Sequence, residues 1–282
     1  MQLTVRRPAE LSALPERYGP LFDRIVAQFA ADERVRGMWL HGALGRGQAD
    51  AGSDMDVAVA VRDENFAEFA GEWQGWLAAI TPTLSARPIG AGSFYALTRT
   101  CERFDVITER VSGLPGTSMC RRVVVFDRDN LSALIPGPAD PPPDQVKISY
   151  LIEETLRQAA TFPTVIIRED WLMGVRAVQH IQLFLYDLFA ESNKPAPLTG
   201  PRQWSFKLTT YQREVLTGLP TPAPNEQSVR SARDAALAAF LAEARPIADQ
   251  AGVAWPDDLE DAVAAFLAGE GCPLPARSRS HK

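Results

Sequence analysis

The feature that most constrains the fold is a pattern of apolar run, glycine-rich turn and second apolar run over residues 35–61. Residues 35–40 (Val-Arg-Gly-Met-Trp-Leu) are mainly apolar, as expected for a short buried strand. The turn that follows contains Gly42, Gly45 and Gly47. Glycine lets the backbone turn tightly and come close to a ligand. Residues 57–61 (Val-Ala-Val-Ala-Val) then predict a second strand. The pattern therefore predicts two strands of a sheet, with a turn between them that presents backbone N–H groups to an anion.

Two aspartates stand where this turn leads into the second run. Asp54 and Asp56 are separated by one residue, so the two-residue period of a strand predicts both carboxylates on one face. Neighbouring carboxylates repel each other, and a hard divalent cation relieves that repulsion. Mg²⁺ is usually held by one or two carboxylates together with the phosphates of a substrate. The turn and the two acids therefore predict one shared site.

A third acid, Asp105, interrupts an apolar and β-branched run at residues 103–108 (Arg-Phe-Asp-Val-Ile-Thr). An aspartate in a central strand needs a functional reason. If its strand lies beside the one that carries Asp54 and Asp56, the three carboxylates can hold two Mg²⁺ ions about 3.5 to 4 Å apart. Such a pair of ions stabilises the attacking and leaving oxygens of an in-line displacement at phosphorus.

The rest of the chain indicates two domains. Apolar residues at helical spacing over 18–33 and 63–80 predict helices that pack on the sheet. Further strands are expected at 93–98, 103–110 and 121–127, which gives a mixed sheet of four or five strands. Prolines cluster at 136–143, where a helix cannot continue. Beyond them the pattern is helical over 144–162, 168–191, 201–217, 227–249 and 256–269.

The predicted fold class is therefore α+β, a mixed β-sheet domain with flanking helices, followed by an all-α helical bundle. We place the first domain at residues 1–140 and the second at 141–282, with a disordered tail from about residue 273. The 46% hydrophobic content over 282 residues is enough for a sizeable core in each.

Composition predicts a cytoplasmic protein with no membrane or nucleic-acid partner. No apolar run approaches the roughly 18 residues of a membrane span, and the N-terminus does not resemble a signal peptide. The three cysteines form no metal-binding or disulfide pattern. A net charge of −6 weighs against binding a phosphate backbone, and the basic stretch 277–282 is expected to be a solvated tail.

The glycine turn, the Asp-Met-Asp element twelve positions after Gly42 and the later Asp105 resemble the nucleotidyltransferase superfamily of DNA polymerase beta-like proteins. The nearest resemblance is to the small bacterial antibiotic nucleotidyltransferases that act on aminoglycosides or lincosamides. It implies catalytic and metal-binding roles for Asp54, Asp56 and Asp105. It implies nucleotide-binding roles for Gly42, Ala43, Arg46, Ser53 and Lys207. Ala43 departs from the family, which has a serine there, so a hydroxyl expected to contact the triphosphate is missing.

The activity implied by this resemblance is Mg²⁺-dependent transfer of a nucleoside monophosphate to a hydroxyl of a small molecule, with release of pyrophosphate. The expected donor is ATP or another nucleoside triphosphate. The expected acceptor is an aminoglycoside-type antibiotic, which suits the acidic charge balance. The helical domain is expected to wall the acceptor pocket, and the protein to be a monomer or a homodimer.

Several alternatives remain open from the sequence. The chain is either an active enzyme, a catalytically degenerate nucleotide-binding module, or a toxin–antitoxin-type nucleotidyltransferase with a protein or RNA partner. The acceptor's proton is taken by Asp105, Glu102 or Glu109. Arg46 either pairs with phosphate or caps the loop, and Lys207 either faces phosphates or is an ordinary solvated lysine. His41 is expected to be a hydrogen-bonded structural residue.

Overall fold

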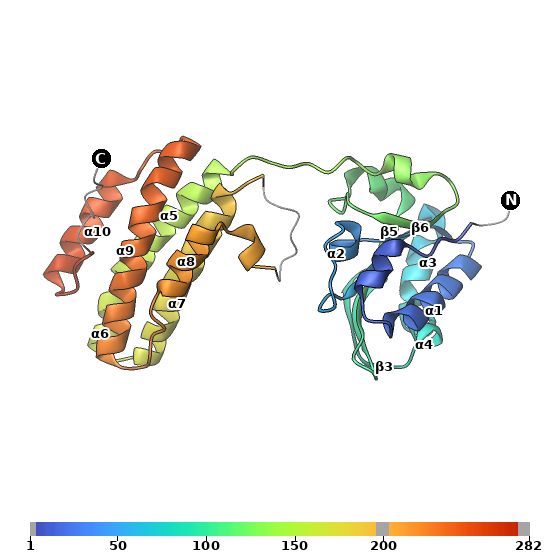
Figure 1. Cartoon of the computed structure of the whole chain (residues 1–282), viewed down its shortest axis with the longest axis horizontal. Coiled ribbons are helices and arrows are strands. Elements are labelled where there is room, and N and C mark those ends of the chain that lie inside the picture. The colour runs from blue at the N-terminus through green and yellow to red at the C-terminus, as the bar shows by residue number, and fades with distance from the viewer. Residues whose placement is uncertain (1–3, 196–202, 276–282) are drawn as a thin grey trace. The chain divides into compact units, whose positions relative to one another are not determined.

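Two compact units make up the fold in this computed structural model, which describes residues 4–195 and 203–275 (Figure 1). The units meet in sequence between Ala139 and Asp140. Among the described residues, the two main clusters of buried side chains share no member, so each unit has its own core. The first unit contains the sheet and the second is helical. This confirms the predicted class of an α+β domain followed by a helical one.

The sheet of the first unit has six strands in the order β3-β4-β5-β2-β1-β6. Strands β2 and β5 run parallel, and the other neighbouring pairs run antiparallel. The strands are β1 (Val35–Leu40), β2 (Met55–Val61), β3 (Thr83–Gly90), β4 (Ser93–Thr98), β5 (Arg103–Arg110) and β6 (Val123–Asp127). The predicted strands are all present, and the sheet is mixed as expected.

The strand that the sequence pattern did not predict is β3, at the edge of the sheet. Its residues are mostly exposed and do not alternate between apolar and polar. Pro88 within it has no N–H to donate, which an edge strand tolerates. The expectation of four or five strands was therefore too low, because an exposed edge strand lacks the buried face by which strands are recognised.

Three helices cover one face of this sheet: α1 (Tyr18–Ala31), α3 (Phe66–Gly71) and α4 (Trp73–Ile80) (Figure 1). The ring of Trp76 lies 5.1 Å from that of Phe29 on α1 and 5.1 Å from that of Phe94 on β4, centroid to centroid. The single helix expected over 63–80 is wrong. The segment is divided into η2 (Asp63–Asn65), α3 and α4, with the break at Glu72 after Gly71, a poor helix former.

Alternation along β2 separates the two faces of the sheet. Met55, Val57, Val59 and Val61 belong to the core beneath the helices. Ala60 belongs instead to a small cluster on the opposite face, with Trp39, Leu114 and Leu131. The short helices η3 (Val111–Gly116) and η4 (Leu131–Leu134) contribute the last two of these residues. Residues of β2 that lie an even number of positions from Ala60, including Asp56, are therefore on the face that the long helices leave uncovered.

The second unit is a bundle whose longest helices, α7 and α9, pack against each other and against α5. Its helices are α5 (Gln145–Ala160), α6 (Phe162–Arg168), α7 (Trp171–Ser192), α8 (Thr210–Gly218), α9 (Glu226–Ala251) and α10 (Asp257–Gly269), with the short η5 (Ser205–Lys207). Within the described ranges, no helix is both long enough and apolar enough to cross a bilayer.

Two predicted helices of this unit begin three or more residues later than expected, and the other three begin within one residue of the prediction. The helix expected from residue 168 begins at Trp171, because Glu169 adopts a φ of 51° that ends α6 and Asp170 accepts a hydrogen bond from the Met173 N–H at 3.0 Å. The helix expected over 201–217 begins at Thr210, after a capping box formed by Thr209 and Gln212. Residues 201 and 202, and 276–282 of the predicted tail, lie outside the described residues.

Candidate active site

Asp56 and Asp105 face each other across the only parallel strand pair in the described sheet. Asp56 on β2 is the register partner of Asp105 on β5. Adjacent strands lie about 4.7 to 4.9 Å apart, so two side chains in register on one face start close together. Both residues are half-buried, on the face that the long helices leave uncovered. The sheet thus brings together two of the three acids singled out from the sequence.

Asp54 lies one residue before β2 begins, in a half-buried position. In the described part of the chain, no group of three Asp, Glu, His or Cys side chains is arranged to hold a metal ion. A protein site of three converging carboxylates, as expected for two ions, is therefore not assembled in this structure. A pair of acids still fits Mg²⁺, which commonly takes one or two carboxylates and completes its shell with substrate phosphates and water.

The glycine turn is a single helical turn, α2 (Gly42–Gly45), at the end of β1 (Figure 1). Gly42 has a φ of +58°, and a Cβ atom placed on it would overlap the Asp56 carboxylate and lie only 2.6 Å from its Cγ. A Cβ on Gly45 would overlap the backbone oxygen of Arg121. Both positions therefore need glycine, and the close approach at Gly42 sets the turn directly against one of the paired acids.

The other residues predicted to bind nucleotide in the first unit lie around this turn. Ala43 is within α2, and its carbonyl accepts from the Gln48 N–H at 2.9 Å. Arg46 follows α2, and its Nε is buried without a hydrogen-bond partner. Ser53 stands in the loop before β2, where its hydroxyl is bonded to Asp50. The Ser53 hydroxyl is therefore part of the local turn.

A cavity of about 260 Å³ opens beside α2, and we call it the glycine-turn pocket. It is lined by His41, Gly42, Arg46, Ser118, Met119, Cys120, Arg121, Pro138 and Ala139. All of these residues belong to the first unit. Two lining residues, Gly42 and Arg46, are among those that the sequence predicted to bind nucleotide.

His41 is buried and hydrogen-bonded through one of its two ring nitrogens only. Its side chain is 9% exposed, and burial, reinforced by the Arg122 cation, lowers its pKa to about 4. The ring is therefore neutral at pH 7. One ring nitrogen is hydrogen-bonded to the backbone of Val57, but Nε2 is buried without a partner. The sequence does not predict the unpaired Nε2 atom, because whether that atom finds a partner depends on the surrounding fold.

Glu109 and Glu102, the other two candidates for the general base, are held in structural contacts. An oxygen of Glu109 lies 2.6 Å from a guanidinium nitrogen of Arg122, which is almost fully buried, and the Thr117 hydroxyl donates to the other oxygen at 2.7 Å. Glu102 is buried and accepts hydrogen bonds from the hydroxyls of Thr98 and Thr100. These contacts tie both carboxylates to neighbouring loops.

Lys207 belongs to the second unit, at the end of η5. Its backbone carbonyl accepts from the Asn193 side chain at 2.8 Å. Its charge acts on Asp187 of α7, whose pKa is raised by burial and lowered in part by Lys147 and Lys207. Lys207 is thus part of a charged cluster within the helical unit.

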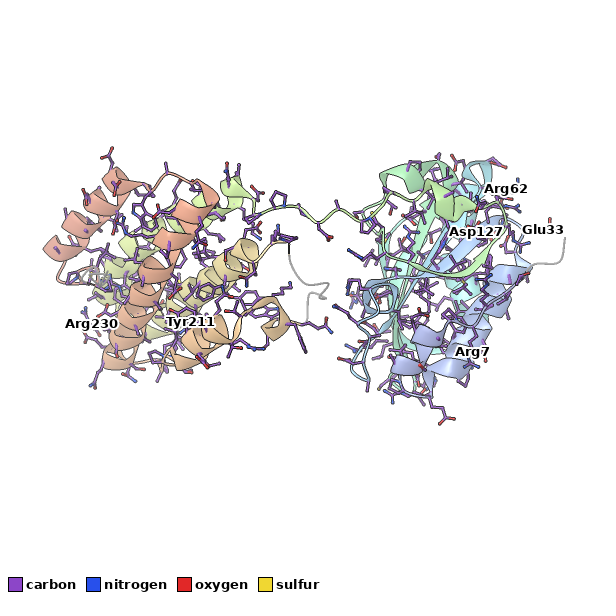
Figure 2. All side chains as sticks on the ribbon, turned by 45° about the horizontal axis from the view of Figure 1, so that its top comes forward. Arg7, Glu33, Arg62, Asp127, Tyr211 and Arg230 are labelled. Atoms are coloured by element: carbon purple, nitrogen blue, oxygen red, sulfur yellow. The ribbon has the colours of Figure 1, made fainter. Side chains whose placement is uncertain are left out.

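Two aromatic residues near Lys207 are more exposed than expected for core side chains. Trp204 is 51% exposed and its ring stacks on that of Tyr186, with centroids 4.3 Å apart. Tyr211 lies on α8 (Figure 2). It is 57% exposed, and its hydroxyl donates to Glu243 at 2.5 Å. The helical unit therefore presents aromatic surface to solvent.

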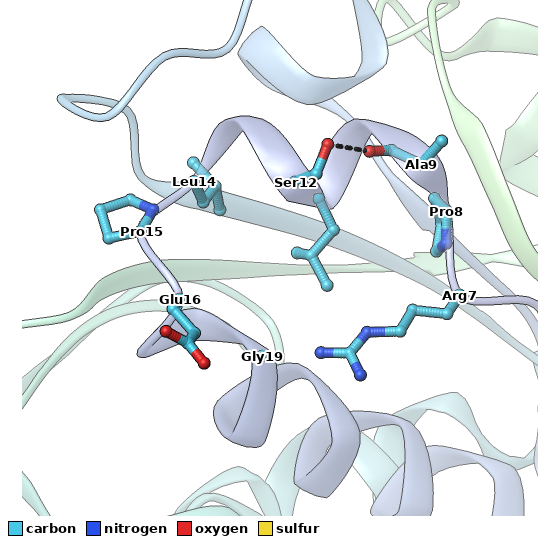
Figure 3. Close-up of a pocket in the computed structure, with 9 residues that line it drawn as sticks. Arg7, Pro8, Ala9, Ser12, Leu14, Pro15, Glu16 and Gly19 are labelled. Carbon is cyan, nitrogen blue, oxygen red and sulfur yellow. Dashed lines mark hydrogen bonds between the residues drawn. The ribbon is translucent and has the colours of Figure 1, made fainter.

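A larger cavity of about 510 Å³ lies against the N-terminal segment, beside η1 (Ala9–Ala13) and the start of α1 (Figure 3). Arg7 and Glu16 are its charged lining residues. None of the residues singled out from the sequence lines it. Size alone therefore does not identify the candidate site.

Comparisons with known proteins give only distant similarity. No protein-family model and no curated protein matches the sequence. The chain is similar to an aminoglycoside 6-adenyltransferase from Bacillus subtilis, with 15% identity, a TM-score of 0.41 and coverage of 94% of this chain and 100% of that one. It is also similar to the CdnE cyclic dinucleotide synthase of Elizabethkingia meningoseptica, with 11% identity, a TM-score of 0.30 and coverage of 88% and 82%.

A third solved structure, CdnC in complex with a HORMA protein from E. coli, has 13% identity, a TM-score of 0.30 and coverage of 95% of this chain and 93% of that one. Identities and TM-scores this low assign no activity to the chain. The functional conclusion therefore depends on the site itself.

Proposed function

We propose that this protein transfers a nucleoside monophosphate from a nucleoside triphosphate, ATP first among them, to a hydroxyl of a small molecule. The acceptor that we favour is an aminoglycoside-type antibiotic, and pyrophosphate is the second product. One observation carries the proposal. Asp56 and Asp105 are in register on adjacent parallel strands, and the glycine turn lies against the Asp56 carboxylate.

Metal binding is assigned to these acids. Asp56 and Asp105 would hold Mg²⁺, with Asp54 joining them when nucleotide is bound, and two ions are part of the proposal. The metal, when bound, offsets negative charge on the phosphates and on the attacking and leaving oxygens. The position of the metal would depend on the Asp56 carboxylate, and Gly42 leaves the space that this carboxylate occupies.

Phosphate binding is assigned to α2 and Arg46. The first N–H groups of a helical turn have no acceptor within the turn, so they can donate to phosphate oxygens. This contact uses the backbone and does not need the serine hydroxyl that Ala43 replaces. The Arg46 guanidinium supplies a positive charge and several donors at the same turn. The phosphate-binding role of Lys207 stays a prediction from the sequence.

Asp105 is proposed either to complete the metal site or to take the acceptor's proton, and it is preferred to Glu102 and Glu109 as the base. A general base must lie within hydrogen-bond reach of the proton that it takes. Asp105 stands in register with Asp56, and thus beside the proposed metal and phosphate. Glu109 pairs with Arg122 and Thr117, and Glu102 accepts hydrogen bonds from Thr98 and Thr100.

The helical unit is proposed to recognise the acceptor. Its exposed aromatic rings, Trp204 and Tyr211, offer faces on which a sugar ring can stack. The Asp187 carboxylate acts on Tyr186, whose pKa is raised by burial and by that carboxylate, and the Tyr186 ring stacks on Trp204. An acidic group and aromatic faces together suit a polyhydroxylated cation.

The test is pyrophosphate release by the purified protein with Mg²⁺ and each nucleoside triphosphate, against a panel of aminoglycosides and lincosamides. We expect release that depends on one drug and one nucleotide. The Asp54→Asn variant should lose orders of magnitude in turnover while its fold, measured by circular dichroism, is unchanged. An unchanged rate in that variant would refute the metal assignment.

A second candidate function is a nucleotide-binding module without catalysis. Ala43 favours it, because the missing hydroxyl removes a contact expected for the triphosphate. Tight nucleotide binding measured by calorimetry, with no pyrophosphate release across the acceptor panel, would support this alternative over the enzyme.

A further inference from the structure

The loop that leads into Asp54 and the start of β2 is closed on itself. Asp50 Oδ1 accepts from the Gly52 N–H at 2.8 Å and from the Ser53 hydroxyl at 3.2 Å. The Ser53 N–H donates to the Asp50 carbonyl at 3.0 Å, and the Asp50 N–H donates to the Ser53 hydroxyl oxygen at 3.1 Å. Residues 50–53 therefore form one tight turn, and a contact that holds this turn also holds the backbone that leads into Asp54.

Arg103 on β5 ties this turn to the sheet. Its guanidinium donates to the Gly52 carbonyl at 2.5 Å. The backbone N–H of Arg103 donates to the hydroxyl of Tyr18 at 3.1 Å, and Tyr18 is buried at the start of α1. Arg103 also pairs with Leu97 on β4. The backbone of Arg103 is thus fixed on two sides, which makes its side chain a firm attachment point for the turn.

The register of the parallel strands places Arg103 beside the acids. Asp56 is the register partner of Asp105. Continued by two residues toward the start of both strands, this register sets Asp54 opposite Arg103. The two-residue period of β5 puts the Arg103 side chain on the same face as that of Asp105. The bond from Arg103 to Gly52 therefore acts next to the acids, two residues before Asp54 in the chain.

We propose that Arg103 is a positioning residue, which holds Asp54 where it can share a divalent cation with Asp56 and Asp105. The inference rests on the proposed function, because it takes these acids as the metal ligands. Arg103 itself touches neither metal nor substrate in this proposal. It acts on Asp54 through the Gly52 carbonyl.

The charge of Arg103 and its bond to Gly52 have opposite effects on metal affinity. A fixed positive charge beside carboxylates repels a second cation, so charge alone would make metal binding tighter when a neutral residue replaces Arg103. Loss of the attachment makes metal binding weaker, since loss of indirect support for a ligand costs about 10–100-fold in metal affinity. The sign of the change therefore separates positioning from charge.

The test is the affinity of the full chain for the α,β-methylene analogues of ATP and GTP, which cannot undergo transfer. Calorimetry in Mg²⁺ and in EDTA gives the gain in affinity that depends on the metal. Arg103→Met should lower this gain about tenfold, with the affinity in EDTA unchanged. Arg103→Lys keeps a cationic donor and should retain most of the gain. An equal or larger gain in Arg103→Met, or an equal loss in Mg²⁺ and in EDTA, overturns the proposal.

Arg110 offers a matched control at the other end of β5. Its guanidinium donates to the Asp63 carbonyl at 3.0 Å, just after the end of β2. This is the same kind of attachment between the same two segments of chain, but it is remote from the acids. Arg110→Met should therefore leave the Mg²⁺-dependent gain unchanged. A loss equal to that of Arg103→Met would show that the effect is not specific to the turn before Asp54.

The dependence on Asp54 is tested by a double variant. If Arg103 acts through Asp54, it has nothing left to position once that carboxylate is removed. Asp54→Asn and the double variant Asp54→Asn/Arg103→Met should therefore bind the analogues equally in Mg²⁺. A further loss in the double variant would mean that Arg103 acts on another group, and the proposal would be wrong.

Hydrogen exchange of the metal-free protein checks the attachment itself. Arg103→Met should speed exchange of the amides of residues 52–54 and leave those of β2 protected. Unchanged exchange at 52–54 would show that the bond to Gly52 does not hold the turn. If Arg103→Met does not fold, Arg103→Leu is the second neutral variant for the same measurements.

This design separates the inference from the proposed function. Failure of pyrophosphate release on every acceptor, with an Mg²⁺-dependent gain that needs Arg103 and Asp54, removes the transferase and leaves the positioning role. Normal pyrophosphate release with an unchanged gain in Arg103→Met removes the positioning role alone. No binding of either analogue by the wild type removes both.

Discussion

At the residue scale, Gly42 combines two requirements that other residues cannot meet. Its φ of +58° is costly for a side chain, and the space that a Cβ would need is taken by the Asp56 carboxylate. Gly47 has a φ of +69°, but a Cβ on it would meet no atom within 4 Å. The two glycines therefore separate the cost of the backbone conformation from the cost of displacing the acid.

Gly42→Ala should lower the free energy of unfolding by about 1–3 kcal/mol, because it combines backbone strain with overpacking. It should also lower turnover at least tenfold, since Asp56 must move. Gly47→Ala should show a smaller loss of stability, near 1 kcal/mol, with turnover retained. Chemical denaturation and pyrophosphate release measure the two effects. Equal loss of turnover in both variants would show that the contact with Asp56 is unimportant.

The sequence predicts which acids belong to this site, but it does not predict how they are arranged in space. The spacing of Asp54 and Asp56 before a β-branched run predicts a shared face, and Asp105 is conspicuous in its own apolar run. The register between Asp56 and Asp105 is set when β2 and β5 pair across an intervening stretch that contains β3 and β4. The unpaired His41 Nε2 depends on the same tertiary packing, so no local pattern predicts it.

At the element scale, a buried ion pair fixes the segment that walls the glycine-turn pocket. Arg122 is held by Glu109 of β5, by the Met119 carbonyl at 2.6 Å and by the Thr117 hydroxyl at 2.9 Å. Its guanidinium also lies over the ring of Trp39 at 5.4 Å. Residues 117–122 are thus folded around one cation, and their position depends on its charge partner.

Glu109→Gln should lower the free energy of unfolding by about 3 kcal/mol, because it leaves a buried cation without its counter-ion. The matched control is Glu64→Gln, at an exposed pair 3.9 Å from Arg62, which should cost less than about 1 kcal/mol. Alkylation of Cys120 should accelerate in the first variant only. An unchanged denaturation midpoint in Glu109→Gln would argue that the pair contributes nothing to the segment.

Asp187 on α7 has a pKa raised by burial, and the charge of Glu191 on the same helix adds to this rise. The cations of Lys147 on α5 and Lys207 on η5 lower the pKa, but they do not cancel the rise. For an acid whose folded pKa exceeds the unfolded one, stability is greatest below the unfolded pKa and falls as pH rises through the folded pKa. Asp187→Asn should therefore raise the melting temperature at pH 7 relative to the wild type, and the gain should vanish near pH 3. A gain that is the same at both pH values would point to packing instead of ionisation.

At the scale of the whole molecule, the two cores have no described residue in common, so they should respond to mutation separately. Leu21 of α1 is 1% exposed in the first core, and Leu185 of α7 is 0% exposed in the second. Leucine-to-alanine changes at such positions cost about 2–5 kcal/mol.

Differential scanning calorimetry should show a separate unfolding transition for each of the two units. Leu185→Ala should lower the transition of the helical unit and leave the other in place, and Leu21→Ala should do the reverse. Nucleotide should raise the transition that Leu21→Ala lowers, because the glycine turn and the paired acids belong to that unit. One transition, shifted equally by both variants, would mean that the units unfold as a single cooperative body and that each core depends on the other.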